Sequence, residues 1–346
     1  MSAAPTVTAS FARRGVLGRL SALAAARETG IFLALVLVLV VTTAKSPSFL
    51  FSADGFRDLL LTPSTLVLIA VGQAIVIITR NVDLSVGSII GLTAYLTGVL
   101  FKYNPGLPIP VVMLLAVLFG AGLGLVNGLL VSVAKVPSLV ITLGTLYAYR
   151  GINVVWTGSN RINASDMPRD FLAIGTAKLW VLPVITLVAV VVLVIAALVL
   201  RSSRSGRELY AIGSDPDAAH LYGLKVGRRV LWAFVASGTL AGLAGVLYTA
   251  RYGTVDSQAG YGLELQAVGA AVIGGVAIFG GSGSVGGAAL GAVLLLTINR
   301  ALPVLGIPDF WQGAVVGVLI IAAIILDRLL ALRQARKLTV MEDSAA

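Results

Sequence analysis

The chain has 346 residues, of which 58% are hydrophobic and only 12% charged, and its formal net charge is +10. Soluble proteins carry about 25% charged residues, so this composition indicates an integral membrane protein. The lack of cysteine excludes disulfides, zinc–thiolate sites and a cysteine nucleophile, and a single histidine, His220, excludes a multi-histidine metal site. The positive charge is typical of cytoplasmic loops in membrane proteins, so no nucleic-acid partner is expected.

Ten apolar stretches are candidate membrane spans, because a membrane helix needs about 20 mainly apolar residues. In chain order they are residues 29–46, 61–79, 84–101, 109–133, 137–156, 179–200, 230–250, 263–280, 284–302 and 312–330. The third, fifth and eighth contain polar or glycine-rich breaks, where an irregular path is an open alternative to a continuous helix. The sequence therefore predicts an all-α membrane protein with about ten transmembrane helices in a lipid bilayer.

Lysine and arginine are concentrated in the N-terminal tail (1–28), the loop 201–229 and the C-terminal tail (331–346). Because positively charged loops remain in the cytoplasm, all three segments are predicted to be cytoplasmic, and an even number of spans agrees with both tails lying on one side. The N-terminal tail lacks the early apolar core of a signal peptide and is predicted to be retained. Residues 29–330 then form one transmembrane domain.

The two halves of this domain resemble each other. The stretch "LGLVNGLLVSVAKVPSLVITLGTL" (123–146) is similar to "LGAVLLLTINRALPVLGIPDFWQG" (290–313), and "DLSVGS" at Asp83 corresponds to "ELQAVGA" at Glu264. Five is an odd number of spans, so two five-helix halves would have opposite orientations, as in many transporters. Chance similarity between glycine- and leucine-rich spans is the alternative.

Several catalytic and cofactor chemistries are absent. The chain has no GxxxxGK[ST] motif, so it does not bind ATP through a P-loop. The run "GSGSVG" from Gly281 to Gly286 has the spacing of a dinucleotide fingerprint but lies between two apolar spans, which favours a tight turn. No nucleophile–base pair or metal-ligand cluster is present, and no series of midspan acids suggests a proton relay. The chain is therefore not expected to be an enzyme or to hold a cofactor.

Polar residues inside apolar spans are the candidates for a translocation path, because burying a charge there costs at least about 2.5–3.5 kcal/mol. In "RNVDLSVGS", Asp83 and Ser85 are good helix N-caps, and the start of that helix could also lie beside the path. The midspan amides could line a path for a hydroxyl-rich solute or join helices, and both interpretations stay open. The candidates are Gln73, Asp83, Ser85, Asn127, Glu264 and Asn299.

The loop "GRELYAIGSDPDAAHLYGLKVGRR" (206–229) contains signals for a short helix. Ser214 or Asp215 can cap it, Pro216 suits its first position, and Gly223 can end it in a left-handed turn. A helix of about two turns is not stable alone, so it must dock. The residues leave open whether it docks on the chain's own spans or on a partner.

This loop, followed by "FVASGTLAGLAGVLYTAR", resembles the coupling region of ABC importer permeases of the ribose/xylose/rhamnose/autoinducer-2 type. "NVDLSVGSIIGLTAYLTG" resembles the DLSVGS segment of that family, and "LELQAVGAAVIGGVAIFGGSGSVGGAALGA" resembles its late glycine-rich segment. The resemblance covers about residues 67–325, with the three motifs in order. The commoner family pattern has Gly-Ile where this chain has Asn81-Val82, which leaves the solute open.

The resemblance implies an importer in the bacterial cell membrane. Two permease subunits, copies or paralogues, would form the pore, an extracytoplasmic binding protein would deliver a monosaccharide or sugar-like signal, and separate cytoplasmic ATPase subunits would bind the ATP. The coupling residues implied by the motif are Gly206, Glu208, Asp215, Pro216, Asp217, Ala218, Ala219 and Gly223. A stand-alone secondary transporter or facilitator of a small polar solute is the alternative.

Overall fold

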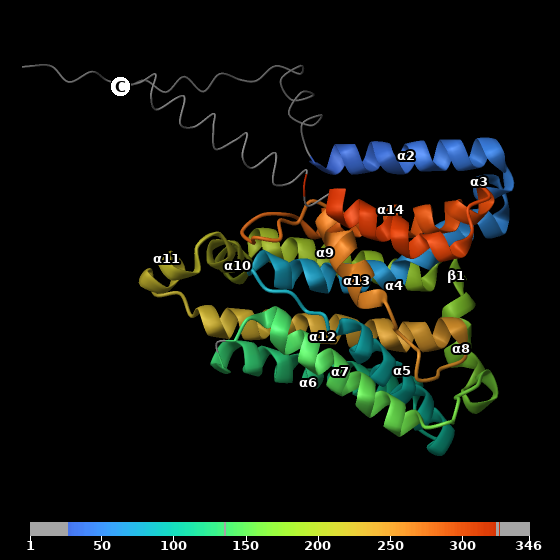
Figure 1. Ribbon diagram of the computed structural model, residues 1–346. Coiled ribbons are helices and arrows are strands. Elements are labelled where there is room, and N and C mark those ends of the chain that lie inside the picture. The colour runs from blue at the N-terminus through green and yellow to red at the C-terminus, as the bar shows by residue number, and fades with distance from the viewer. Residues whose placement is uncertain (1–26, 135, 323–324, 326–346) are drawn as a thin grey trace, which may run out of the picture.

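The computed structural model describes residues 27–134, 136–322 and 325, and its long helices lie side by side in one bundle (Figure 1). One end of the bundle carries the short helix α11, and the other carries α3, α8 and strand β1. The bundle helices are α2 (Arg27–Lys45), α4 (Ala53–Ile78), α5 (Val86–Tyr103), α6 (Ile109–Ala134), α7 (Ser138–Thr157), α9 (Val184–Ser202), α12 (Val226–Tyr252), α13 (Leu263–Ile273), α14 (Val285–Val304) and the helix Gln312–Ala322.

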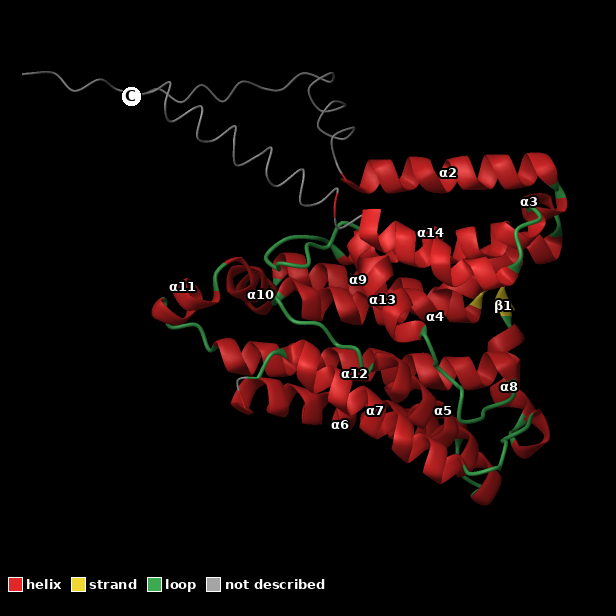
Figure 2. Ribbon diagram, viewed as in Figure 1, coloured by secondary structure: helices red, strands yellow, loops and turns green. Residues whose placement is uncertain are grey.

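Short elements connect the bundle helices, and strands are confined to one two-stranded hairpin in the described chain (Figure 2). In this hairpin Lys178 pairs with Pro183 in an antiparallel register. The short elements are α3 (Ser48–Phe51), η1 (Ala164–Asp166), α8 (Arg169–Thr176), β1 (Lys178–Leu179), β2 (Leu182–Pro183), α10 (Arg204–Ser214), α11 (Pro216–Leu221) and η2 (Asp309–Trp311).

The predicted all-α membrane class is confirmed. In the part of the chain that the structure describes, seven helices are long and apolar enough to cross a membrane, namely α2, α4, α5, α6, α9, α12 and α14. The other three predicted spans also coincide with helices, but α13 and Gln312–Ala322 are short and α7 has 20 residues of more polar composition. The count of ten spans therefore stays a prediction.

Of the three spans that could be irregular, one is broken in the structure and two are not. The third and fifth predicted spans are continuous helices, α5 and α7. The eighth is broken, because α13 ends at Ile273 and a glycine-rich loop runs to Ser284, with left-handed backbone at Gly275, Gly280 and Gly281. The predicted C-terminal tail (331–346) and residues 1–26 of the predicted N-terminal tail (1–28) lie outside the described residues, whereas Arg27 and Glu28 form the start of α2.

Helices α4 and α12 form the centre of the bundle. In α4, 94% of the most apolar stretch is buried, against 11% in α2 and 17% in α9. A helix that is apolar on all sides is expected to lie inside, whereas outer helices turn apolar side chains toward lipid. α4 also packs on α13 and α14, and α12 packs on α5 and α6. The second long helix of each predicted half, α4 or α12, thus packs against helices of the other half.

Glycines allow α6 and α12 to approach closely. Gly120 and Gly124 of α6 face Gly238 and Gly242 of α12, with the glycines four residues apart in each helix. A Cβ added at Gly238 would lie 2.4 Å from the Gly120 carbonyl oxygen and 2.7 Å from the Gly124 Cα. In a membrane, where water does not drive helices together, such close backbone packing is a main source of association.

We predict that Gly238→Ala destabilises the bundle, because the new methyl group has no space against α6. Overpacking of this kind typically costs about 1–3 kcal/mol, and the midpoint of thermal unfolding in mild detergent should fall. Gly122→Ala is the matched control, because the same addition on α6 meets nothing within 4 Å. Equal melting curves for the two variants would contradict close packing at this seam.

Candidate functional site

The predicted docking helix is present as α11. The Asp215 side chain caps it, with Oδ1 accepting hydrogen bonds from the backbone N–H groups of Asp217 and Ala218, each at 3.0 Å. Pro216 occupies the first turn, and Gly223 follows the helix with a φ of +78°. The capping and termination predicted from the sequence are therefore confirmed.

The segment before α11 is also helical, which the sequence reading missed. Helix α10 begins after Ser203, whose Oγ accepts a hydrogen bond from the Gly206 N–H at 2.9 Å. Its buried face includes Leu209 and Ile212, at a spacing of three residues. The Ser203 cap and this spacing were the available signals. A Cβ at Gly206 would lie 2.2 Å from the Leu200 carbonyl oxygen, so Gly206 permits the close turn from α9 into α10.

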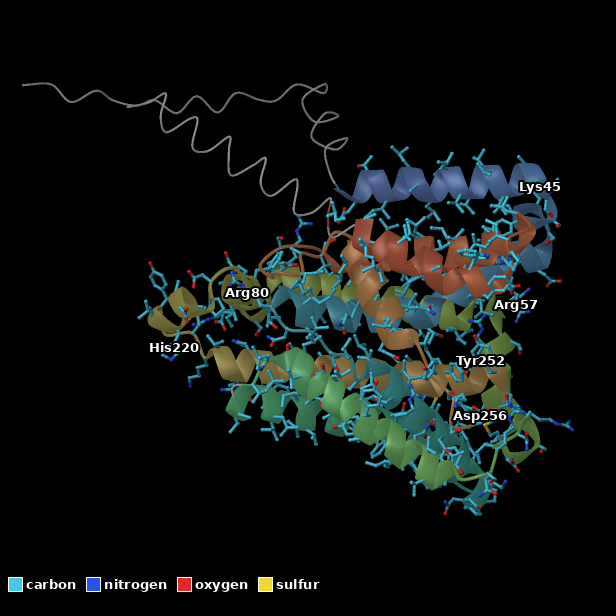
Figure 3. All side chains as sticks on the ribbon, in the orientation of Figure 1. Lys45, Arg57, Arg80, His220, Tyr252 and Asp256 are labelled. Carbon is cyan, nitrogen blue, oxygen red and sulfur yellow. The ribbon has the colours of Figure 1, made fainter. Side chains whose placement is uncertain are left out.

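Helix α11 projects from the end of the bundle, with His220 near its tip (Figure 3). Leu221 and Tyr222 are each 87% exposed, whereas Ala219 is buried. The exposed residues of this segment that the sequence had singled out are Asp215, Asp217 and Gly223. The apolar tip formed by Leu221 and Tyr222 was not predicted, because an apolar pair within a loop does not reveal which way it faces.

An ion-pair cluster holds α10 against the start of α12. Arg204 Nε donates to Glu208 Oε1 at 2.8 Å, and Arg229 Nε of α12 donates to Glu208 Oε2. Arg229 also donates to Ser205 Oγ at 2.9 Å. The hydrogen bonds from Arg229 and Arg204 hold the pKa of Glu208 below its ordinary value. Glu208 thus joins the two helices that flank α11.

Four of the six path candidates form one buried hydrogen-bond network. Asp83 Oδ1 accepts from the Ser85 N–H at 3.0 Å and from Ser85 Oγ at 2.6 Å, and Asp83 Oδ2 accepts from Ser237 Oγ of α12 at 2.9 Å. Asn127 Nδ2 of α6 donates to Ser85 Oγ at 2.6 Å. The Gln73 amide of α4 pairs with the Asp83 backbone, at 3.1 Å to its oxygen and 3.2 Å to its nitrogen. All five residues are buried.

This network favours the packing interpretation of Gln73 and Asn127, because their side chains join α4, α5 and α6. The predicted side-chain cap of α5 is not confirmed, because its N-cap residue Ser85 makes no side-chain cap bond and Asp83, two residues earlier, accepts from the Ser85 N–H rather than from the first turn of the helix. Ser237 was missed because it lies in a run of small residues without a distinguishing signal. Whether these residues also line a path for solute stays a prediction.

Glu264 and Asn299 lie outside this network. Glu264, in the first turn of α13, is 9% exposed and accepts from the Gly262 N–H at 3.2 Å through Oε1. Glu264 Oε2 and Asn299 Oδ1 have no hydrogen-bond partner among the described residues. Unpartnered buried oxygens are costly, so they suit contact with a solute, water or a second chain. Among the described residues, no group of three or more histidine, cysteine, aspartate or glutamate side chains could hold a metal ion.

Comparison with known proteins shows which sequences this chain is similar to. The family described as "Branched-chain amino acid transport system / permease component" matches residues 56–324. The "Autoinducer 2 import system permease protein LsrC" of Enterobacter sp. (strain 638) is 36% identical over 87% of this chain and 86% of its own. The protein of the same name from Escherichia coli O9:H4 (strain HS) is 35% identical to this chain over the same shares of both proteins. The one from Yersinia enterocolitica serotype O:8 / biotype 1B is also 35% identical, over 80% of this chain and 76% of its own. No solved structure matches the chain significantly.

We predict that Ser237→Ala weakens the junction of α5 and α12. The change leaves Asp83 Oδ2 buried without this donor, which typically costs about 1–3 kcal/mol of folding free energy. Thr239→Val is the matched control, because the Thr239 hydroxyl donates only within its own helix, to the Val235 carbonyl at 2.7 Å. Thermal unfolding in detergent measures both variants, and equal stability would show that the bond to α12 contributes nothing.

We also predict that the contact between α10 and α12 loosens in acid. Because the pKa of Glu208 is depressed in the folded protein, its contribution is complete above the ordinary value of 4.5 and is lost as the pH falls through the lower folded value. Amide hydrogen exchange in α10, corrected for intrinsic rates, should be constant from about pH 7 to pH 5 and increase below 4.5. Glu208→Gln should exchange faster throughout without that transition, and the same transition in this variant would exclude Glu208 as its cause.

Proposed function

The chain belongs to the transport-system permease family that matches it from residue 56 to residue 324, and on this premise we propose how the permease is energised. It is a multi-pass permease of an import system, in a family of transport proteins rather than enzymes. We propose that separate cytoplasmic ATPase subunits bind the ATP and drive this chain through α11. The alternative of a stand-alone secondary transporter is not favoured, because the relatives are components of import systems.

The projecting tip of α11 is the observation that carries this proposal. A helix of six residues is too short to be stable alone, yet here it is capped by Asp215 and anchored through α10. Its exposed apolar residues, Leu221 and Tyr222, point away from the bundle's own core. A rigid helix with an apolar tip fits a groove on a partner protein. The segment 206–223 is thus proposed as the coupling element, with the Glu208 cluster as its support.

We propose that the solute is autoinducer 2 or a related sugar-like molecule. Support comes from the name that the relatives share. The match to the Enterobacter protein covers 87% of this chain. The family description mentions branched-chain amino acids, but the relatives share one name and match 80–87% of this chain, so they are the more specific guide. A hydroxyl-rich solute needs both donors and acceptors, and the unpartnered atoms Arg150 Nη2, Asn153 Oδ1 and Glu264 Oε2 provide both kinds.

The path would run along the sides of α5, α7 and α13 that carry these atoms. A Cβ at Gly87 would lie 1.9 Å from Glu264 Oε2, and one at Gly91 would lie 3.1 Å from Asn153 Nδ2, so these polar groups approach α5 at its glycines. Tyr261, whose ring centre is 5.5 Å from the Arg150 guanidinium carbon, is largely exposed. A second permease subunit, copy or paralogue, would close the path, and an extracytoplasmic binding protein would deliver the solute.

The exchange of helices between the halves supports the proposed inverted repeat of two five-helix units. Contacts of α12 with α5 and α6 correspond to contacts of α4 with α13 and α14 when each span is matched with the fifth span after it. On this basis we propose that the chain crosses the membrane ten times and that both tails lie in the cytoplasm. Consistently, α2 begins at the end of the bundle that carries α11 and runs toward α3 (Figure 1).

We predict that Gly223→Val weakens ATPase binding while membrane insertion remains normal. Space is not limiting at Gly223, but its left-handed backbone costs a valine roughly 1–2 kcal/mol, which corresponds to about 5- to 30-fold in affinity. Gly306→Val is the control, because Gly306 has a φ of +86° and equally open surroundings at the end of α14. Affinity purification in mild detergent, with quantification of the copurified ATPase, measures the effect.

Wild-type protein should retain a stoichiometric ATPase, Gly306→Val should retain the same amount, and Gly223→Val should retain less. Full retention by Gly223→Val would show that α11 is not the docking element. Purification of the wild-type chain without any ATPase, even after gentle crosslinking, would contradict the proposed function as a whole.

A further inference from the structure

Arg80 lies where the turn between α4 and α5 meets the end of α10 (Figure 3). Its backbone has a φ of +63°, a left-handed conformation that residues other than glycine rarely adopt. Arg80 Nε donates to the Gly213 carbonyl at 2.6 Å, and Nη2 donates to the Ser214 carbonyl. These carbonyls close α10, where a cation is favoured by the helix dipole, and they directly precede the cap of α11. The guanidinium therefore holds the base of the docking helix.

A third segment, the glycine-rich loop between α13 and α14, closes around this junction. The Gly281 N–H donates to the Ile78 carbonyl at 2.9 Å, and the Tyr210 hydroxyl donates to the Gly283 carbonyl at 2.9 Å. A Cβ at Gly280 would lie 2.4 Å from Arg80 Cγ. Because the three segments are in contact without spare space, α10 cannot shift far without displacing the turn that carries Arg80.

That turn leads directly into the buried network. The Val82 N–H donates to Ser138 Oγ at 3.1 Å, and the Val82 carbonyl accepts from Thr142 Oγ1 of α7 at 3.1 Å. The next residue is Asp83, which binds Ser237 of α12. The short segment from Asn81 to Asp83 thus connects Arg80 to α7 and α12 through hydrogen bonds and leads into α5.

The same turn forms one wall of a cavity of about 670 Å³. The wall includes Arg80, Asn81 and Val82, and α7 and α12 contribute other sides through Leu139 and Val230. Pro216, in the first turn of α11, also lines it. The cavity therefore opens beside the docking helix, between the helices that the turn connects.

We infer that Arg80 is the positioning residue that transmits movement of α11 to the turn between α4 and α5, and so to the shape of this cavity. Arg80 need not contact the solute in this role. The inference rests on the proposed function, because an ATPase must move α11. The hydrogen bonds from the Arg80 guanidinium to the Gly213 and Ser214 carbonyls are the mechanical link between α11 and the turn.

Arg80→Asn tests this link, because asparagine tolerates left-handed backbone but cannot reach the two carbonyls. The chain has no cysteine, so Leu139→Cys introduces a single reporter thiol on the cavity wall. The complex with its ATPase and binding protein is reconstituted in liposomes, with and without ATP. A membrane-impermeant maleimide reports the accessibility of the thiol, and uptake of autoinducer 2 is measured per ATP hydrolysed. Arg228→Asn, which removes the same charge from the neighbouring start of α12, is the control.

In the control, ATP should change the maleimide rate. In Arg80→Asn the ATPase should remain bound and hydrolyse ATP, the rate should no longer respond, and uptake per ATP should fall by about 5- to 150-fold, the usual range for coupling between two sites. Arg80→Lys, which keeps the charge and can reach one carbonyl, should be intermediate, and it serves as the second variant if Arg80→Asn fails to fold.

A normal maleimide response and normal uptake per ATP in either variant would overturn the transmitting role. Loss of the ATPase from both variants would also overturn it, because Arg80 would then be a docking residue. Absence of the ATPase from the wild-type complex would overturn the proposed function, and this inference with it. The copurification step therefore distinguishes the two failures.

Discussion

The break between α4 and α5 is the constraint on which the rest of the structure depends. Non-helical backbone at membrane depth must find its hydrogen bonds within the protein, because lipid offers none. Here Gln73 pairs with both backbone groups of Asp83, while Ser138 and Thr142 of α7 bind the two backbone groups of Val82. Polar side chains on two neighbouring helices are therefore needed simply to make this turn possible.

Satisfying the break also brings the two halves of the chain together. The Asp83 carboxylate, which accepts from the Ser85 N–H just before α5, also accepts from Ser237 Oγ on α12. α12 can come this close because Gly238, the next residue, lies against glycines of α6. Polar bonds and glycine contacts thus act at the same level of the bundle, and both tie the second half to α5 and α6. A helix exchange of this kind makes the halves interdependent, so neither is expected to fold alone.

Local signals in the sequence were sufficient for the class, for the positions of the long helices and for the cap and end of α11, but not for α10. Asp215, Pro216 and Gly223 act through neighbouring backbone, so their roles can be inferred from the chain order alone. The buried network could be inferred only in part. Asp83 was recognised as a polar residue at a helix start, but its partner Ser237 is 154 residues away, and no local pattern predicts which helix faces which. The irregular eighth span was recognisable because its glycines mark left-handed turns.

The residues of the proposed coupling segment 206–223 separate into two groups that sequence resemblance alone does not distinguish. Gly206, Glu208 and Ala219 face the protein itself, where they allow tight packing, hold the ion-pair cluster or bury a methyl group. Leu221 and Tyr222 lie in the same stretch and face outward, but they are not among the coupling residues that the resemblance implies. A motif preserves the scaffold that presents a docking helix, whereas recognition depends on the side chains at its tip. Specificity for one ATPase over another is therefore expected to follow the two tip residues rather than the motif positions.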